Sequence, residues 1–444
     1  MISELREKAA EHDIHTVEVG APDTQGRLRG KRVPVDRFFT SVAESGVSIA
    51  DAMFVFDMQD DLPDNEFVNM DTGYLDCRLV PDLQSMRILT YRPGYALVFA
   101  DAFDPNNEPH PLAPRSVLAN QIERCREQGL DPLVATEMEF YLCTPDWEPV
   151  QNHIQYSSLT DALELEEVLR DMRHAIAGAG IEVESSNAEY GPGQIELNTG
   201  PADAMTAADN TVLYKSIIKQ VAVQHGLRAT FMPKPWTEAS GSGMHVHTSL
   251  NVDGANAFAD SDEEPNELMS KWLAGLLEHT LPLTLLGSPT SNGPKRIRPY
   301  TFAPTHVHWG LDNRTVLARC ITESGSSANR VEFRPAGADA NPYLIIAGVL
   351  AAGADGVERS LVPPPMSQGD MYTNPGDCTP LPTDLSGAVA AYESSTLAQQ
   401  LGDMFSRSYA SIAAAEVALE AENSESDDPD HVSQWERDRF IEHC

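Results

Sequence analysis

At positions 243–248 the chain reads Gly-Met-His-Val-His-Thr. This stretch places His245 and His247 two residues apart, with Met244 and Val246 beside them. Because residues i and i+2 of a β-strand point to the same face of a sheet, both imidazoles would share one face and the apolar side chains the other. A half-exposed surface strand can show the same alternation, so its meaning depends on the rest of the chain.

Three other stretches repeat this alternation with different polar groups. Each has ionisable or amide side chains two residues apart, with apolar residues between or beside them. They are Thr136-Glu-Met-Glu-Phe-Tyr-Leu142, Gly193-Gln-Ile-Glu-Leu197 and Arg330-Val-Glu-Phe-Arg334. Four such strands, carrying Glu, His and Arg, predict a polar-lined cavity backed by a hydrophobic core.

The polar groups on and near these strands indicate the chemistry of the cavity. Many carboxylates with few imidazoles suit the hard cations Mg²⁺ or Mn²⁺ better than zinc. Crowded carboxylates repel one another unless a cation neutralises them, and arginines beside them suit phosphate or carboxylate ligands. Phosphoryl transfer requires metals beside arginines, whereas any single pair could be a surface salt bridge. The residues are Glu137, Glu139, Glu189, Glu196, Glu332, His245, His247, Arg330 and Arg334.

Composition limits the partners of this 444-residue chain. The net charge of −36 argues against nucleic acid and anionic membrane, and it suits either a cationic substrate or plain solubility. The sequence shows no apolar run long enough to span a bilayer and no secretory signal. The six cysteines lack metal or disulfide spacing, so we expect a cytoplasmic protein with free thiols. No P-loop is present, so ATP would need a different phosphate-binding site.

Turn and periodicity signals divide the chain. A Pro- and Asn-rich stretch at 104–114 predicts a boundary between domains at 1–105 and 106–444. Residues 16–39 predict small sheet units around the turn at Asp23–Gly26. A Pro- and Gly-rich loop is expected at 362–382, and the acidic run at 422–430 reads as a solvated link. Helices are predicted at 115–128, 163–177, 204–225, 266–286, 342–359, 385–401 and 432–443.

Taken together, the motifs resemble the glutamine synthetase superfamily across about residues 130–350. The resemblance implies an α+β fold with an N-terminal β-grasp domain and a larger catalytic α/β domain around a funnel-shaped site. It also implies a homo-oligomer, a dodecamer of two stacked hexamers, with each site between adjacent subunits. The matching segments are Asp76-x5-Asp82, Glu137-Met-Glu139-Phe, Glu189-Tyr-Gly-Pro-Gly-Gln-Ile-Glu196, Lys234-Pro, Gly241-Ser-Gly-Met-His245-Val-His247-Thr-Ser249, Pro289-Thr-Ser-Asn-Gly-Pro-Lys-Arg296, Asn313-Arg314, Asn329-Arg-Val-Glu-Phe-Arg334 and Ala340-Asn-Pro-Tyr343.

The resemblance also implies a role for each matched residue. Glutamate would attack ATP to give γ-glutamyl phosphate, and an amine would then displace phosphate. One metal would be held by Glu139, Glu189 and Glu196, and the second by Glu137, His245 and Glu332. Glutamate would be bound by Arg296, Arg334 and the backbone of Gly241. The implied phosphate-binding arginines are Arg314, Arg319 and Arg330, with Arg314 counted as catalytic beside Arg296 and Arg334, and His247 and Ser249 would lie on the adenosine side.

Departures from the family pattern bear on the second substrate. Ammonia-using members carry a flap glutamate where this chain has Phe302, and Phe can neither accept a proton nor pair with ammonium. They also have an Asp-Gly-Ser-Ser segment, whereas here Asp51 is followed by Ala-Met and is either a shifted equivalent or an unrelated residue. Asp51 and Phe302 are the candidate residues of the amine site. The stretches around Gly191 and Phe302 look like the γ-glutamyl-amine branch, which includes γ-glutamylputrescine and γ-glutamylmethylamide synthetases.

Three functions therefore stay open at this point. The first is an ATP-dependent ligase that joins a primary alkylamine or a polyamine to glutamate. The second is a true glutamine synthetase that uses ammonium, and the third is a non-catalytic descendant. The sequence does not identify the amine; Phe302 and Trp309 favour a small or apolar one, although Trp309 is better explained by core packing.

Overall fold

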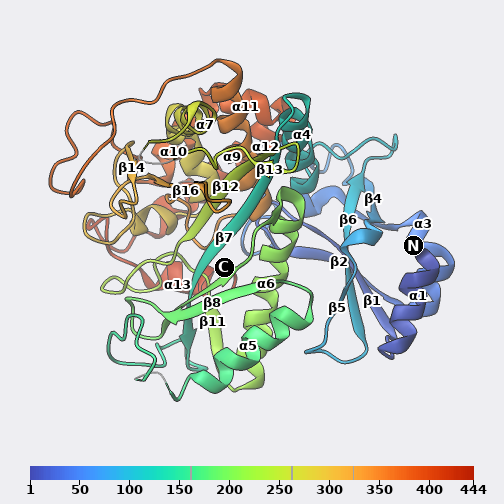
Figure 1. Cartoon of the computed structure of the whole chain (residues 1–444). Helices are drawn as coiled ribbons and strands as arrows, with labels where there is room; N and C mark the ends of the chain where they lie inside the picture. Colours follow the sequence, from blue (N-terminus) through green and yellow to red (C-terminus); the bar gives the residue numbers. More distant parts are fainter. Residues whose placement is uncertain (161–162, 262–263, 324) are drawn as a thin grey trace.

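Two β-sheets lie side by side in the computed structural model, which describes residues 1–444 except 161–162, 262–263 and 324 (Figure 1). The smaller sheet has the strand order β2-β1-β6-β4-β3, with β5 paired to β6. The carboxylate of Asp23 accepts the backbone N–H groups of Gln25 and Arg27, and this closes the predicted turn between the first two strands. The strands are β1 (Thr16–Pro22), β2 (Leu28–Pro34), β3 (Val47–Ala50), β4 (Asp76–Pro81), β5 (Arg87–Ile88) and β6 (Tyr95–Phe103).

The larger sheet holds the four strands predicted from the alternating stretches. Its order is β14-β15-β16-β12-β7-β9-β8, with β10 and β11 on β7 and β13 on β12. The predicted strands are the consecutive neighbours β16, β12, β7 and β9, so the prediction is confirmed. The strands are β7 (Asp131–Cys143), β8 (Val183–Ala188), β9 (Gln194–Thr199), β10 (Ala202–Asp203), β11 (Arg228–Thr230), β12 (Met244–Val252), β13 (Ala255–Asn256), β14 (Trp309–Leu311), β15 (Ala318–Ile321) and β16 (Arg330–Phe333).

Helices cover the sheets and account for most of the predicted helical segments. The segments at 115–128, 163–177, 204–225, 342–359 and 432–443 are confirmed, with ends shifted by a few residues. The helices are α1 (Ile2–Glu11), α2 (Val35–Arg37), α3 (Ala43–Ser45), α4 (Pro114–Glu127), α5 (Glu166–Gly178), α6 (Ala204–Gln224), α7 (Glu267–Glu278), α8 (Thr280–Gly287), α9 (Pro342–Glu358), α10 (Leu385–Glu393), α11 (Thr396–Leu401), α12 (Asp403–Asn423) and α13 (Gln434–Phe440).

Two predicted helices are each broken in two. The segment at 266–286 separates into α7 and α8 at His279, because Pro282 has no N–H to donate to Glu278 and its ring would clash with that carbonyl. The segment at 385–401 separates into α10 and α11 at Ser395. There the backbone is extended, and the Ser395 hydroxyl accepts the N–H of Ala398 at 3.1 Å as the cap of a new helix.

Helices α6 and α7 pack on the apolar side of the large sheet and leave its polar side open. Met138, Val246 and Val331, which alternate with the polar residues, are all buried. The indole N–H of Trp272 on α7 donates to Thr248 Oγ1 on β12 at 3.0 Å, so the helix is tied to the middle of the sheet. The apolar side therefore forms the core, and the polar side forms the wall of a cavity.

The remaining sequence expectations concern the loop, the link and the cysteines. Residues 362–382 are irregular, as predicted, and residues 424–430 of the predicted link are exposed, whereas Glu422 and Asn423 form the end of α12. All six cysteines are free thiols, five of them buried. Trp309 is buried, and its indole N–H donates to Pro364 O at 2.8 Å, which confirms core packing. Within the described residues, no helix has both the length and the apolar character needed to cross a membrane.

Candidate active site

Strand register brings the predicted polar residues into one row across the large sheet. Residues directly opposite each other in antiparallel strands lie on the same face, close enough to interact. The row therefore spans strands that are far apart in the sequence. The opposed pairs are Glu139 with Glu196, Glu137 with Asn198, His245 with Glu137, His247 with Glu332, and Arg319 with Glu332.

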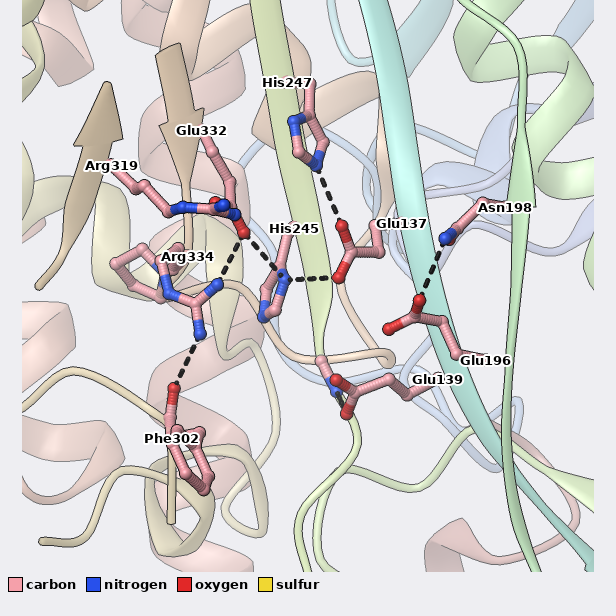
Figure 2. Close-up of polar contacts among 12 residues, drawn as sticks. Glu137, Glu139, Glu196, Asn198, His245, His247, Phe302, Arg319, Glu332 and Arg334 are labelled. Carbon is pink, nitrogen blue, oxygen red and sulfur yellow. Dashed lines mark hydrogen bonds and ion pairs between the residues drawn. The ribbon is translucent and has the colours of Figure 1, made fainter. Parts of the chain in front are cut away.

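One half of the row is a cluster of imidazoles and carboxylates (Figure 2). His245 Nδ1 lies 3.2 Å from a carboxylate oxygen of both Glu137 and Glu332, and His247 Nε2 lies 3.1 Å from the other oxygen of Glu137. Ligand atoms of Glu137, His247 and Glu332 lie within 4.8 Å of one another. These donors fit a divalent cation, and both imidazoles adjoin the same carboxylates.

The ionisation of this cluster follows from its contacts. Burial raises the pKa of Glu137, but hydrogen bonds from His245 and His247 outweigh burial and leave that pKa lowered. Burial likewise opposes the charged form of Glu332, yet the charge of Arg334 and the bond from His245 hold its pKa well below the usual range. Burial and Arg334 disfavour a charged His245, but its bonds to the two carboxylates raise its pKa to about 9.

The other half of the row contains Glu139, Glu189 and Glu196, which form no ion pair within the part of the chain that the structure describes. Burial, together with the charges of Glu137, Glu139 and Glu189, raises the pKa of Glu196 to about 9. Burial and the charge of Glu139 raise the pKa of Glu189 to about 7. A bound cation would relieve this repulsion, and an all-carboxylate set is what Mg²⁺ or Mn²⁺ prefers. The residues present therefore fit a divalent metal.

Amide side chains orient these carboxylates, and sequence reasoning did not assign them a role. Asn198 Nδ2 donates to Glu196 at 2.8 Å, and Asn187 Nδ2 donates to Glu189 at 3.1 Å. Gln194 Nε2 lies 3.3 Å from Glu139, which also accepts the N–H of Gly243 at 2.8 Å. Each amide lies two residues from a site carboxylate on an extended stretch, and this spacing was the signal available in the sequence.

Two arginines contact the Glu332 carboxylate of this cluster. Arg334 Nη1 donates to Glu332 at 2.5 Å while its Nη2 donates to the backbone carbonyl of Phe302 at 3.0 Å. Arg319 Nη1 pairs with the second oxygen of Glu332 at 3.1 Å. Both arginines therefore flank one carboxylate (Figure 2).

Arg296 is buried against a glycine-rich wall. Its Nη1 donates to Pro335 O at 3.0 Å and its Nη2 lies 3.3 Å from His245 Nε2. A Cβ atom at Gly241 would lie 2.5 Å from Arg296 Cγ, and one at Gly243 would lie 2.5 Å from Arg296 Nη2. Only glycine at these two positions leaves room for the guanidinium beside the cluster.

A cleft of about 340 Å³ opens next to Glu137. His247, Ser249 and Arg330, three of the residues predicted to bind ATP, line it together with Glu137. Arg330 Nε donates to His247 Nδ1 at 3.1 Å, which fixes the ring beside the cleft. The cleft is adjacent to the imidazole–carboxylate cluster, as a nucleotide whose phosphates reach that cluster would require.

The structure leaves two predicted residues outside these contacts. Arg314 is exposed in the turn between β14 and β15. Asp51 begins a short 3-10 turn (Asp51–Phe54) beside the small sheet, where burial raises the pKa of its carboxyl. Among the described residues, its Oδ1 has no hydrogen-bond partner. Phe302 does adjoin the row, with its backbone carbonyl on Arg334 and its side chain about half exposed.

Comparison with known proteins agrees with this geometry. Residues 111–438 match the family described as "Glutamine synthetase, catalytic domain". A glutamate–isopropylamine ligase from a Pseudomonas species is 35% identical, with 99% of this chain and 98% of that protein covered. A gamma-glutamylethanolamide synthetase from Streptomyces coelicolor is also 35% identical, with 99% and 96% covered.

The fold agrees as well. A solved GmaS–ADP complex superposes with a TM-score of 0.84 at 29% sequence identity, covering 98% of both chains. The resemblance that the motifs carried and the predicted fold class are thereby confirmed. The chain belongs to the glutamine synthetase family.

Proposed function

We propose that this chain joins a primary alkylamine or a polyamine to the γ-carboxylate of L-glutamate, with consumption of ATP and release of ADP and phosphate. The relatives named as glutamate–isopropylamine ligase and gamma-glutamylethanolamide synthetase, both aligned over almost the whole chain, support this activity. The carboxylates and arginines of the row supply what phosphoryl transfer to glutamate requires.

We assign the residues to roles as follows. Bound Mg²⁺ or Mn²⁺ would neutralise the phosphates of ATP and the site carboxylates. Arg296 and Arg334 orient the glutamate carboxylates, since a guanidinium matches a carboxylate in bidentate fashion. The cleft lined by His247 and Ser249 takes the adenosine side. The two metal sets are Glu139, Glu189 and Glu196, and Glu137, His245 and Glu332; the phosphate-binding arginines are Arg314, Arg319 and Arg330.

The position of Phe302 supports an alkylamine, and not ammonium, as the second substrate. Ammonium is compact and strongly hydrated, so a site for it needs carboxylates in place of that hydration. An alkylamine instead brings apolar surface, worth about 0.8 kcal/mol per buried CH₂. The Phe302 phenyl ring, about half exposed at the edge of the row, offers such an amine an apolar contact.

A phosphate-release assay tests the proposal. Glutamate and ATP are supplied with ammonium, methylamine, isopropylamine, ethanolamine or putrescine, one at a time. We expect release above background with at least one alkylamine or polyamine and much less with ammonium. Equal use of ammonium and every amine would indicate a glutamine synthetase, and no release with any would indicate a non-catalytic chain.

We also propose that the working form is a homo-oligomer, by family resemblance a dodecamer. Asp51, a candidate residue of the amine site, forms no contact with the row among the described residues, and this supports a site completed by an adjacent subunit.

A further inference from the structure

Glu436, on the last helix α13, is a buried carboxylate with 2% of its surface exposed. Part of its bonding is a local capping box: its Oε2 accepts the backbone N–H of Ser433 at 2.9 Å and the Ser433 hydroxyl at 3.0 Å. Two further donors come from distant sequence. Asn292 Nδ2 donates to Oε1 at 2.9 Å, and Lys295 Nζ donates to Oε2 at 2.7 Å. Capping alone explains neither of these.

The two distant partners flank the turn that carries Arg296. Lys295 precedes Arg296 in the clamp turn (Gly293–Arg296), and Asn292 is the residue before that turn. Asn292 also binds both backbone groups of Lys234, accepting its N–H at 2.8 Å and donating to its carbonyl at 3.0 Å. Glu436 therefore holds the clamp turn and the start of the neighbouring 234–243 loop in one network.

These two segments carry Arg296 and Gly241, the residues proposed to bind glutamate, and they adjoin each other. The 234–243 loop ends in the glycines whose missing side chains leave room for Arg296, with Gly241 in direct contact with it. The strap (residues 430–436) also contacts both segments elsewhere. The N–H of Val432 donates to Thr237 Oγ1 at 3.0 Å, and Asp430 forms an ion pair with Arg298.

We infer that Glu436 is a positioning residue for glutamate: its buried carboxylate sets the distance between Arg296 and the Gly241 wall through Lys295 and Asn292. The inference rests on the proposed function. Loss of the carboxylate would leave the partly buried Lys295 ammonium with the carbonyl of His431 at 2.6 Å but without a negative charge, and the clamp turn would shift in response. Small displacements of a substrate-orienting arginine have large kinetic effects. The cleft proposed for adenosine is lined by none of the strap residues and should be unaffected.

The kinetic test uses Glu436→Gln, which keeps the shape and removes the charge. We expect the KM for glutamate to rise about tenfold or more and the KM for ATP to stay within about twofold, since ground-state binding of one substrate alone is altered. Asp438→Asn is the matched control, because Asp438 is an exposed carboxylate on the same helix whose one hydrogen bond among the described residues is with Gln434. It should leave both KM values unchanged. Equal changes in both KM values, or no change in either, would overturn the inference.

Hydrogen exchange measured by mass spectrometry separates this inference from the proposed function. In Glu436→Gln, peptides covering 234–243 and 292–298 should exchange faster than in the wild type, while those covering 194–199 should not. Lys295→Met removes the same ion pair without touching the helix cap, and it should reproduce both effects if Glu436→Gln does not fold. If Glu436→Gln exchanges faster but the wild type releases no phosphate with any amine, only the proposed function is refuted. Unchanged exchange in a folded variant would refute the positioning role.

Discussion

The backbone of Phe302 adopts a φ angle of 58°, in the left-handed region that a residue with a Cβ atom visits at a cost of about 1–2 kcal/mol. This conformation accompanies the carbonyl contact with Arg334, while the phenyl ring extends from the same edge of the site (Figure 2). The loop that carries Phe302 (residues 297–305, the flap) is thereby joined to Glu332 through a single guanidinium. A change of side chain at Phe302 can therefore alter the proposed amine site without removing the hydrogen bond that its backbone makes.

Phe302→Glu tests the amine preference. In the wild type we expect kcat/KM for the best alkylamine to exceed that for ammonium by at least about 100-fold, a difference of about 2.7 kcal/mol in transition-state stabilisation. The glutamate side chain should narrow this gap, mainly by weakening alkylamine use, because it replaces apolar surface with a charge. Steady-state kinetics with both nucleophiles measure the ratio.

Phe302→Leu serves as the control, since it keeps an apolar side chain on the same backbone. It should retain the alkylamine preference. If Phe302→Glu and Phe302→Leu lose both activities to the same extent, the ring only packs the flap and does not select the amine.

Glu139→Ala tests the metal assignment. The carboxylate is held by Gly243 and Gln194 and faces Glu196 across the strand pair, so its removal should abolish ATP-dependent phosphate release and leave the fold intact. Glu123→Ala, at an exposed position on α4, should have no effect. Retention of more than about a tenth of wild-type activity, a loss below about 1.4 kcal/mol, would contradict a metal-binding role for Glu139.

At the scale of single elements, the site strands were predictable and their neighbours were not. Period-two alternation fixes which side chains share a face, so Glu137 with Glu139, and His245 with His247, could be grouped from the sequence. The register that sets His245 opposite Glu137 depends on pairing between residues more than a hundred positions apart, which local patterning does not encode. The family resemblance supplied what the pattern could not.

Helix α12 shows a different limit. Its Ala-rich sequence has high intrinsic helix propensity, but its apolar positions do not form one continuous stripe, so periodicity gave no signal there. The helix breaks at His279 and Ser395 could in principle be predicted from the sequence. Pro282 and the paired serines Ser394 and Ser395 are the breakers, yet the apolar pattern on both sides of each break continues across it.

The close crossing of α7 and α9 leads to a stability prediction. A Cβ atom at Gly275 would lie 2.0 Å from the carbonyl oxygen of Ala352 on α9, which is backbone and has little freedom to move. Gly275→Ala should therefore lower the free energy of unfolding by about 1–3 kcal/mol, the usual range for overpacking. Denaturant titration followed by fluorescence measures this loss.

Gly387→Ala is the matched control for that measurement. Gly387 lies in α10, and the nearest contacts of an added Cβ would be Asp384 Oδ1 at 3.3 Å and Pro382 Cβ at 3.5 Å. Alanine there should be neutral or slightly stabilising, because it favours helix more than glycine does. Equal destabilisation by both substitutions would mean that the α7–α9 crossing is not tightly constrained.

For the whole molecule, metal removal should be visible as lost stability. A cation that binds only the folded chain stabilises it by about 2.7 kcal/mol at a concentration of 100 times its dissociation constant. The melting temperature should therefore fall in EDTA and recover with excess Mg²⁺ or Mn²⁺. The same titration on Glu196→Gln should show a smaller recovery; identical recovery in both proteins would exclude Glu196 as a ligand.

Oligomeric state is the second prediction at this scale. Light scattering coupled to size-exclusion chromatography should give a mass that is a multiple of 48.5 kDa, and twelve copies if the family assembly holds. Each site would then be completed by the small sheet of an adjacent copy. A monomeric mass together with full activity would rule out both the assembly and the shared site.

The separation between the paired strands and the loop that carries Phe302 has a consequence for how such proteins diversify. Residues 297–305 belong to no strand or helix, so insertions or exchanges there leave every ladder hydrogen bond in place. A one-residue shift in β7 or β12, in contrast, would turn each catalytic group to the opposite face of the sheet. If Phe302 selects the amine as proposed, evolution could keep the strands that carry the phosphoryl-transfer residues while substitutions in 297–305 change which nitrogen compound is used.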